Sequence, residues 1–347
     1  MAAAAPTYAI DAGDVRRDHE AVLDVWHGNL GEDARMRAKY DWFYLRCPYG
    51  EPLLRLLRFG TDAPPVGAAA AGPRRMVDGD RLIEAGVLVD LAVRAEHRSL
   101  GPALMLQSAL AAAGAERFAL LYGFPNPKAA PVFKRVGYEQ LGELVRHARV
   151  LRHAGYAQRR LPRLLAVPVG AILDCLDAMK AWWRRRGDAR LRWHWRDSSD
   201  ERFDALWTRS PHQRAVASIR DSRFTRWRFD DNPLARTRFL IVEDAHGQLR
   251  AWFACQADVG LLHVRDFWSE DGDTGMTRAH IDQLLLAARH SRHAAVSVEY
   301  FGCAQAFAGW TACGFLERSR RPLFGRWSAD DTTRTGRLHL TSADEDE

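Results

Sequence analysis

The residues RAEHRSLGPALMLQSALAAA occupy positions 94–113, directly after the alternating apolar run LIEAGVLVDLAV. This alternation predicts a strand over 82–93, and the Ala- and Leu-rich run predicts a helix over 102–114. The N-terminus of such a helix presents unpaired backbone N–H groups and the positive end of its dipole, which favour a bound phosphate. Gly101 lets the backbone approach a ligand closely, and Arg98 can add a charge-assisted contact. The stretch therefore predicts a phosphate-binding turn between a strand and a helix.

Helical and strand-like segments alternate on both sides of this turn. Gly86 predicts a turn or bulge inside the strand region, and Gly137 predicts the stop of a short helix. Mixed elements of this kind imply an α/β sheet covered by helices. The expected segments are helix 19–30, strand 53–59, a turn or loop over 60–74, strand 117–124 and helix 127–136.

A repeat relates the two ends of the chain. Aligning YDWFYLRCP (40–48) with FTRWRFDDNP (224–233) matches Trp42 to Trp227 and the prolines that end both segments. Further matches follow in the same order, and internal repeats of this kind indicate a duplicated fold. We therefore expect a tandem duplication. The further matches are Asp90 with Asp266, segment 118–124 with 294–302, Gly137 with Gly314, and Tyr138 with Phe315.

Chain length and the repeat together predict two domains with the same mixed sheet, α/β in class with an α+β arrangement. We expect the first domain over 1–150, the second over 197–328, and a polar, acidic, solvated tail over 329–347. The apolar stretch 151–196 predicts a helical linker between the domains. A membrane-touching interfacial helix is the alternative, and Asp174 and Asp177 in its apolar face favour the linker.

Composition argues against several functional classes. The net charge is +6, but only four of the 50 basic residues are lysines, a skew typical of a GC-rich bacterial genome. No nucleic-acid-binding signature accompanies that charge, so we expect no nucleic-acid partner. The five cysteines have no paired or zinc-type spacing, which predicts reduced thiols and no metal. Without an apolar run of about 18 residues or a basic leader region, we expect a cytoplasmic protein. The sequence leaves the oligomeric state open.

Two segments resemble the GNAT N-acyltransferase superfamily. In VRAEHRSLGPAL, the residues Arg98, Gly101 and Ala103 fill the family pattern [QR]-x-x-G-x-[GA], after a strand that ends in Val93. The segment NPKAAPVFKRVGY resembles the family's next helix and turn. There the matching residues are Asn126, Ala129, Phe133, Arg135, Gly137 and Tyr138.

The resemblance implies an acyl-CoA co-substrate, acetyl-CoA or another acyl-CoA, and transfer of its acyl group to an amine. The acceptor would be a small molecule, a sugar amine or a peptide amine. The backbone N–H of Val93 or its neighbour would polarise the thioester carbonyl. The residues implied in acyl-CoA binding are Leu91, Ala92, Val93, Arg98, Ser99, Leu100, Gly101, Ala103, Asn126 and Phe133.

Candidate catalytic residues are Asp90 and Glu84 as the base, and Tyr138 as a proton donor. Asp90 stands out of register with the apolar positions of its strand, and family members often carry a working carboxylate there. Two residues depart from the family pattern. Pro102 has no N–H and so removes one possible diphosphate donor, although proline suits the first position of a helix. Phe133 replaces the tyrosine that many members use to protonate the thiolate.

The second copy lacks the loop pattern. Its corresponding segment, SEDGDTGMTRAH (269–280), carries acidic Glu270, Asp271 and Asp273, which would repel a diphosphate. We therefore expect acyl-CoA binding only in the first copy, with the second contributing to the acceptor pocket or to stability. The alternatives are a Fem-type aminoacyltransferase that uses aminoacyl-tRNA, and a non-catalytic acyl-CoA-binding or assembly protein.

Overall fold

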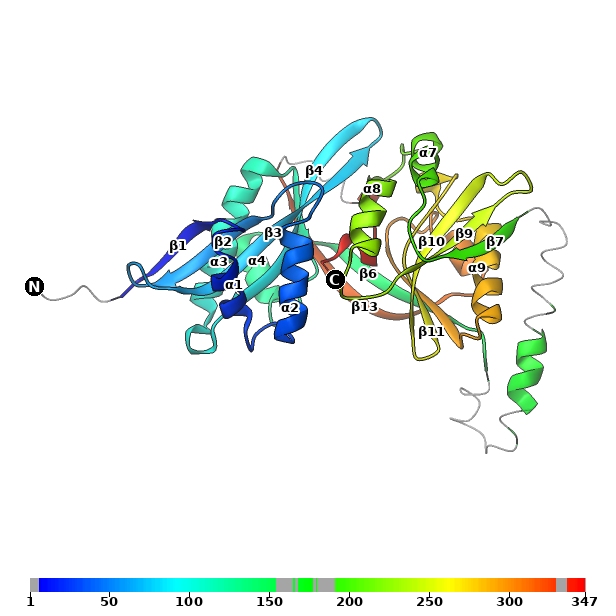
Figure 1. The fold of residues 1–347 in the computed structure, drawn as a ribbon, viewed down its shortest axis with the longest axis horizontal. Helices are drawn as coiled ribbons and strands as arrows, with labels where there is room; N and C mark the ends of the chain where they lie inside the picture. The colour runs from blue at the N-terminus through cyan, green and yellow to red at the C-terminus, as the bar shows by residue number, and fades with distance from the viewer. Residues whose placement is uncertain are drawn as a thin grey trace, which may run out of the picture.

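A computed structural model describes residues 6–153, 165, 168–176, 179, 191–328 and 336–346 of the chain. Two lobes of strands and helices lie side by side, and the C-terminus ends between them (Figure 1). The expected mixed α/β fold is confirmed. Of the predicted linker, residues 168–176 are helical. Much of the remainder lies outside the described residues.

The N-terminal half begins one long sheet. Its strands are hydrogen-bonded in the order β1 (Tyr8–Gly13), β2 (Leu53–Phe59), β3 (Pro65–Asp78), β4 (Arg81–Val93) and β5 (Leu120–Gly123). Its helices are α1 (His19–Trp26), α2 (Asp33–Lys39), α3 (Leu100–Arg117) and α4 (Ala130–Val136). The strand predicted at 53–59 is confirmed, and Gly137 ends α4 in the left-handed conformation, with a φ of 91°.

β3 replaces the loop expected over 60–74, and that expectation is wrong from Pro65 onward. Ala68 and Ala70 pack with α1 in one core cluster, whereas Ala69 and Ala71 pack with α3 in another. Strand side chains alternate between faces, so α1 and α3 cover opposite faces of the sheet. The alanines are small enough to let both helices approach, and a loop-like composition therefore forms a central buried strand.

The C-terminal half repeats this order of strands. From the centre outward it contains β12 (Ala295–Phe301), β11 (Leu261–Ser269), β10 (Leu249–Asp258), β9 (Arg238–Glu243) and β7 (Arg192–Arg196). Its helices are α7 (Arg202–Arg209), α8 (Ser222–Thr225), α9 (Arg278–His290) and α10 (Ala308–Ala312). β7 lies inside the range predicted as linker, so the sheet begins earlier than the expected boundary.

Two long strands interlock the halves. β6 (Glu139–Val150) follows the N-terminal half in sequence, yet it pairs with β12 of the C-terminal half. β13 (Leu316–Trp327) follows the C-terminal half, yet it pairs with β5. The central order is therefore β5-β13-β6-β12, and each half receives a strand from the other. One hydrophobic cluster also spans both halves, so they form a single packed body.

The last described residues are interior, so the expected solvated tail is wrong for 338–346. β14 (Leu338–Thr341) pairs with β12 and with β8 (Val216–Ser218), and β8 pairs in turn with β3. These two short strands close a ring through β3, β4, β5, β13, β6 and β12. The acidic residues that follow β14 enter the ring because buried basic side chains neutralise them there, as described below.

Candidate active site

An opening between β4 and β5 marks the candidate site. The strands run parallel and pair only over Ala85–Val87 and Leu120–Tyr122. Beyond Val87, the β5-facing edge of β4 has no strand partner among the described residues, so its backbone groups can pair with a ligand. Gly86, expected at a turn or bulge, lies instead within the continuous strand. A Cβ there would stand 2.8 Å from the Phe118 ring, so close packing explains this glycine.

A β-bulge at Asp90 accompanies the opening. Where β4 pairs with β3, Val89 lies opposite Ala70 and Ala92 lies opposite Ala68. β4 therefore has two residues between these pairs where β3 has one. The extra residue places Asp90 at a φ of 53°, a left-handed conformation that costs a non-glycine residue about 1–3 kcal/mol. A bulge bends its strand and redirects its side chains. The strain at Asp90 therefore coincides with the separation of the strands.

The opening contains a pocket of about 240 Å³. Asp90, Leu91, Asn126 and Phe133 line it, so the structure brings these four predicted residues together. Gln107 of α3 also lines the pocket; it is buried, and its amide oxygen has no hydrogen-bond partner among the described residues. An unpaired buried acceptor next to a cavity is suited to a ligand that donates a hydrogen bond. The other lining residues are Leu30, Leu88, Val89, Phe124, Pro125, Ala129 and Asp346.

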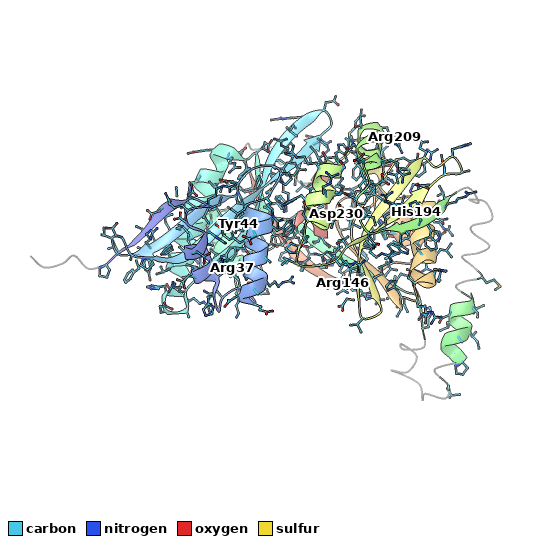
Figure 2. All side chains as sticks on the ribbon, viewed as in Figure 1. Arg37, Tyr44, Arg146, His194, Arg209 and Asp230 are labelled. Carbon is cyan, nitrogen blue, oxygen red and sulfur yellow. The ribbon has the colours of Figure 1, made fainter. Side chains whose placement is uncertain are left out.

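A buried ion cluster forms one side of this pocket. The Lys39 ammonium donates to Asp90 Oδ1 and to Asp346 Oδ2, each at 2.7 Å. Tyr44, which lies inside the N-terminal half (Figure 2), donates to Asp90 Oδ2 at 2.9 Å. The side chains of Lys39 and Asp90 are 2% and 6% exposed, whereas that of Asp346 is 29% exposed. Two carboxylates thus share one ammonium, and Asp346 is the one open to solvent.

The cluster changes the proton affinities of its members. Burial raises the pKa of Asp90, against the opposing charge of Lys39. Burial also works to raise the pKa of Asp346, but the Lys39 charge and hydrogen bond outweigh it and lower that pKa. Burial works to lower the pKa of Lys39, but the two carboxylates hold it above its ordinary value. Lys39 is therefore a permanent cation near neutral pH.

The predicted phosphate turn lies at the start of α3. The helix begins at Leu100, and Ser99 is its extended N-cap residue. Pro102 is thus the third helical residue, where an N–H has no intrahelical partner, so it removes a free donor without breaking the helix. A Cβ on Gly101 would meet nothing within 4 Å, so its backbone is open to a ligand. Ala103 follows in the same first turn.

Arg98 fixes the turn in place. Its guanidinium donates to the carbonyl of Val93 at 3.1 Å and to the side chain of Asn29. It therefore ties the end of β4 to the segment after α1. Val93 and Ala92 themselves pair with Gly67 and Ala68 of β3 and lie outside the pocket lining.

Two predicted catalytic residues are not at the pocket. Glu84 pairs with Arg75 at 3.1 Å, and it stands six residues before Asp90, about 20 Å along the strand. Tyr138 packs its ring 5.2 Å from Phe133, and its buried hydroxyl has no partner among the described residues. Burial raises the pKa of Tyr138 above its ordinary value, which favours the neutral phenol. Neither side chain lines the pocket.

The C-terminal half has a related strand opening that is filled. β11 and β12 pair in parallel from Leu261 to Val264, and a bulge follows next to Asp266. Beyond that point β14 pairs with β12 at Tyr300 and Phe301. Phe267 and Tyr300 pack with the buried rings of Phe307 and Trp310. Strand and aromatic side chains thus occupy the position that is a pocket in the N-terminal half.

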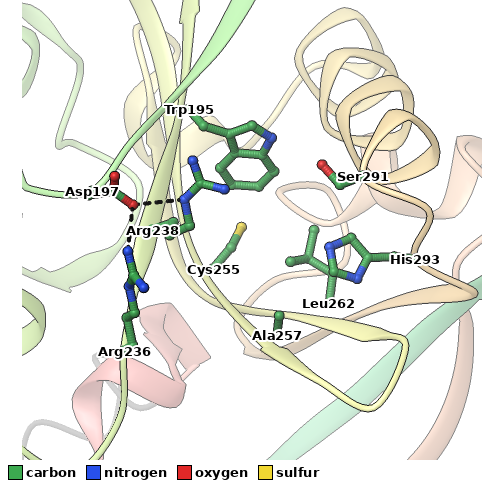
Figure 3. A pocket seen from close by; sticks show the side chains of 9 residues that line it. All are labelled: Trp195, Asp197, Arg236, Arg238, Cys255, Ala257, Leu262, Ser291 and His293. Carbon is green, nitrogen blue, oxygen red and sulfur yellow. Dashed lines mark hydrogen bonds and ion pairs between the residues drawn. The ribbon is translucent and has the colours of Figure 1, made fainter.

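A second pocket, of about 360 Å³, lies on the C-terminal half (Figure 3). Arg236 and Arg238 both pair with Asp197 at its rim, at 3.4 and 2.9 Å. Burial raises the pKa of Cys255 above its ordinary value, so the thiol in this pocket stays protonated. None of the predicted site residues lines it.

Within the described residues, no cluster of His, Cys, Asp and Glu could hold a metal ion. None of the described helices combines the length and the apolar character needed to cross a membrane. All five cysteines are free thiols.

Sequence reasoning missed Lys39, Gln107 and Asp346. Lys39 carried one signal: it directly precedes the repeated segment YDWFYLRCP in a chain with only four lysines. Gln107 is one polar residue in an Ala- and Leu-rich helix, a weak signal by itself. Asp346 carried no signal, because a run of acidic residues is typical of a solvated end.

No model of a known protein family matches the sequence, and no curated protein matches it. Solved structures do match its fold. The chain is similar to a probable N-acyltransferase of unknown function from Enterococcus faecalis V583, with 12% identity and a TM-score of 0.64 over 94% of this chain and 74% of that one. It is similar to a GCN5-related N-acetyltransferase from Anabaena variabilis ATCC 29413, with 11% identity and a TM-score of 0.63 over 95% and 75%.

A third similar structure is Saccharomyces cerevisiae N-myristoyltransferase with bound myristoyl-CoA. The identity is 12% and the TM-score 0.52, over 95% of this chain and 83% of that one. These matches extend over nearly the whole chain. The fold is therefore that of GCN5-related N-acetyltransferases, and its two half-sheets are consistent with two domains of this type.

Proposed function

We propose that this chain, which has the fold of GCN5-related N-acetyltransferases, transfers an acyl group from acyl-CoA to an amine. The observation that carries the proposal is the pocket in the β4–β5 opening, beside the open N-terminus of α3. A thioester substrate of CoA has a diphosphate, a chain of amides and an acyl group. The first turn of α3, the unpaired edge of β4 and the pocket offer complementary groups in that order.

Each part of the site has a role in this proposal. The free N–H groups of Leu100 and Gly101 bind the diphosphate, helped by the helix dipole. The edge of β4 pairs with the amides of the pantetheine chain, and the Gln107 amide oxygen accepts from one of them. Arg98 positions the turn through its bonds to Val93 and Asn29. A pocket of about 240 Å³ holds roughly eight water-sized groups, which favours a short acyl chain such as acetyl.

The reaction requires proton removal and no metal. The acceptor arrives mainly as an ammonium, so one proton must leave before its lone pair can attack the thioester carbonyl. The Asp90–Lys39–Asp346 cluster supplies carboxylate oxygens beside the pocket for that proton. A thiolate is a good leaving group, so solvent can protonate it where Phe133 cannot.

We further propose that the C-terminal half arose with the first by duplication and binds no acyl-CoA. β14 and the aromatic cluster fill its strand opening, and acidic Glu270 and Asp271 precede α9. Its function here is to complete the shared sheet and to deliver the segment 342–346 to the pocket. The free thiols support placing the reaction in the reducing cytoplasm.

Calorimetric titration of acetyl-CoA tests the proposal. We expect the unmodified protein to bind acetyl-CoA, and Gly101→Glu to lose at least tenfold in affinity because it places a negative charge at the diphosphate. Gly101→Gln is the matched control for size; the open space around Gly101 accommodates either side chain. Failure of the unmodified protein to bind acetyl-CoA would refute the proposal. Binding of aminoacyl-tRNA in place of acetyl-CoA would favour the Fem-type alternative.

A further inference from the structure

The segment 342–346 is held in the ring of strands by side chains that bind its backbone. Arg228 Nε donates to the carbonyl of Ala343 at 2.7 Å, and Tyr122 Oη donates to that of Asp344 at 2.8 Å. Arg74 Nη2 donates to the carbonyl of Glu345 at 3.0 Å. Three consecutive carbonyls are therefore fixed from three different elements. These three hydrogen bonds fix the position of Asp346, the next residue, at the pocket.

The C-terminal half contains a matching cluster of one cation and two aspartates that lies away from the pocket. Arg220 donates to Asp266, the residue matched to Asp90, and to Asp344, both at 2.9 Å. All three of these side chains are 0% exposed. Both clusters thus join an aspartate on a bulged strand, through one cation, to an aspartate of the segment 342–346. The buried cluster attaches this segment to the fold.

The N-terminal cluster differs in the features that matter for chemistry. Both oxygens of Asp90 are bonded, one to Lys39 and the other to Tyr44. Asp346 is bonded to a described side chain only through Oδ2, and it lines the pocket with nearly a third of its side chain exposed. Besides Lys39, the charge of Arg228 on the C-terminal side acts on Asp346. Asp346 is therefore the carboxylate in the cluster that a ligand can reach.

We propose that Asp346 binds the acceptor ammonium and accepts its proton, and that Lys39 and Asp90 are positioning residues that hold this carboxylate. The inference rests on the acyltransferase function proposed above and identifies its acceptor as a cationic primary amine. The ammonium transfers one proton to Asp346. The nitrogen lone pair then forms a bond to the thioester carbon, and the carbon–sulfur bond breaks with its electron pair on sulfur. The second proton on nitrogen leaves to solvent, and Asp346 later returns its proton to solvent.

Steady-state acetylation of n-butylamine by acetyl-CoA, measured from pH 6 to 9.5, tests the assignment. We expect Asp346→Asn to bind acetyl-CoA within threefold of the unmodified protein and to lose about 100-fold or more in kcat, the usual contribution of a general base. Asp346→Glu should recover part of the rate. The matched control is Asp258→Asn, an exposed carboxylate at the end of β10, and it should stay within twofold.

Lys39 variants separate positioning from folding. Lys39→Met removes the ammonium that bonds both Asp90 and Asp346, so kcat should fall with acetyl-CoA binding retained, and Lys39→Arg should recover part of the rate. Asp90→Asn should lower kcat less than Asp346→Asn does. A rate unchanged in Asp346→Asn, or a larger loss in Asp90→Asn, would overturn the assignment.

Amine binding can be measured even if turnover is too slow to follow. Calorimetry of n-butylammonium against the protein saturated with acetyl-CoA should show at least tenfold weaker binding for Asp346→Asn than for Asp258→Asn. Equal binding by the two variants, or no binding by the unmodified protein, overturns the inference but leaves acyl-CoA binding intact. Loss of acetyl-CoA binding by the unmodified protein would instead remove the basis of both proposals.

Discussion

Trp42 and Trp227 bind each other reciprocally across the two halves of the chain. Each indole Nε1 donates to the backbone carbonyl of the other residue, at 2.7 and 3.4 Å, and the rings stack with centroids 5.5 Å apart. Each residue lies in a single π-helical turn, η1 (Tyr40–Tyr44) and η3 (Arg226–Asp230). The two tryptophans that the sequence alignment matches are therefore in direct contact in the structure.

We expect Trp42→Phe to lower the free energy of unfolding by about 2–3 kcal/mol, because it leaves the buried carbonyl of Trp227 without its donor and weakens the ring stack. Urea unfolding followed by circular dichroism measures this loss. Trp193→Phe, a partly buried tryptophan of β7, should cost less. Equal losses in the two variants would show that the reciprocal bonds add little.

The carboxylate of Asp344 has buried partners on all sides: Arg220, the hydroxyl of Ser218 and the backbone N–H of Thr341. Asp344→Asn removes the charge opposite a buried guanidinium, so we expect a loss of about 3–5 kcal/mol in unfolding free energy. Asp231→Asn, at an exposed position, should change it by less than about 0.5 kcal/mol. Similar values for both variants in urea unfolding would restore the view of this segment as a solvated tail.

Stability should fall below neutral pH because of His339 in β14. Burial lowers its pKa well below the ordinary 6.5, and the charge of Arg220 adds to this. The unfolded chain therefore takes up a proton below pH 6.5 that the folded chain does not. Each pH unit below 6.5 lowers the unfolding free energy by about 1.4 kcal/mol, until the pKa of His339 in the folded protein is reached. The unfolding free energy should thus be retained above pH 6.5 and decrease from there toward pH 5.

His339→Phe should flatten this decrease, measured as unfolding free energy at pH 7, 6 and 5. His246→Asn, at an exposed turn, serves as the control and should keep the slope. His147, His263 and His293 also have pKa values lowered by burial, so part of the slope should persist in His339→Phe. A slope identical in all three proteins would exclude His339 as a main cause.

Replacing Gln107 by Met should separate ligand binding from folding. The buried amide oxygen has no described partner, so losing it should leave the free protein as stable or slightly more stable. The affinity for acetyl-CoA should fall about 5- to 10-fold, the value of one hydrogen bond. Calorimetry and thermal unfolding of the same samples check both parts. Unchanged affinity would place the pantetheine chain elsewhere.

A fragment of residues 1–153 should not fold as a monomer. It lacks β13, which stands between β5 and β6 and pairs with both. The fragment would expose the edges of both strands, so we expect aggregation or association through those edges. Light scattering and circular dichroism of the refolded fragment test this. A monomeric fragment with native-like helix and strand content would show that the halves are independent.

Local signals in the sequence predicted the local elements well. Strand 53–59, the helix after the phosphate turn and the Gly137 stop follow from periodicity and from backbone conformations that only a few residues favour. β3 was missed because alanine contributes little to either a helical or a strand pattern. The burial of this strand depends on α1 and α3, which cover the two faces of the sheet. The exchange of β6 and β13 was missed because strand partners 145 to 207 residues apart leave no local pattern.

The sequence predicted one part of the candidate site and missed another. The sequence placed Asp90, Leu91, Asn126 and Phe133 near one another, because they lie on consecutive elements of one half. It could not place Lys39, 51 residues before Asp90, or Asp346, 256 residues after it. The contact of Lys39 with Asp346 depends on the ring closed by β8 and β14. Glu84, also expected as a base, lies on the same strand but does not line the pocket.

The exchange of β6 and β13 also determines when this protein can begin to fold during synthesis. The ribosome produces β5 and β6 early, but the strand that fills the gap between them is translated more than 160 residues later. Until those later strands are made, the nascent N-terminal half has one open edge on β5 and two on β6, which are prone to pair with other chains. Slower elongation or chaperone binding in the stretch before residue 316 should therefore affect the yield of native protein more than any change in its finished core.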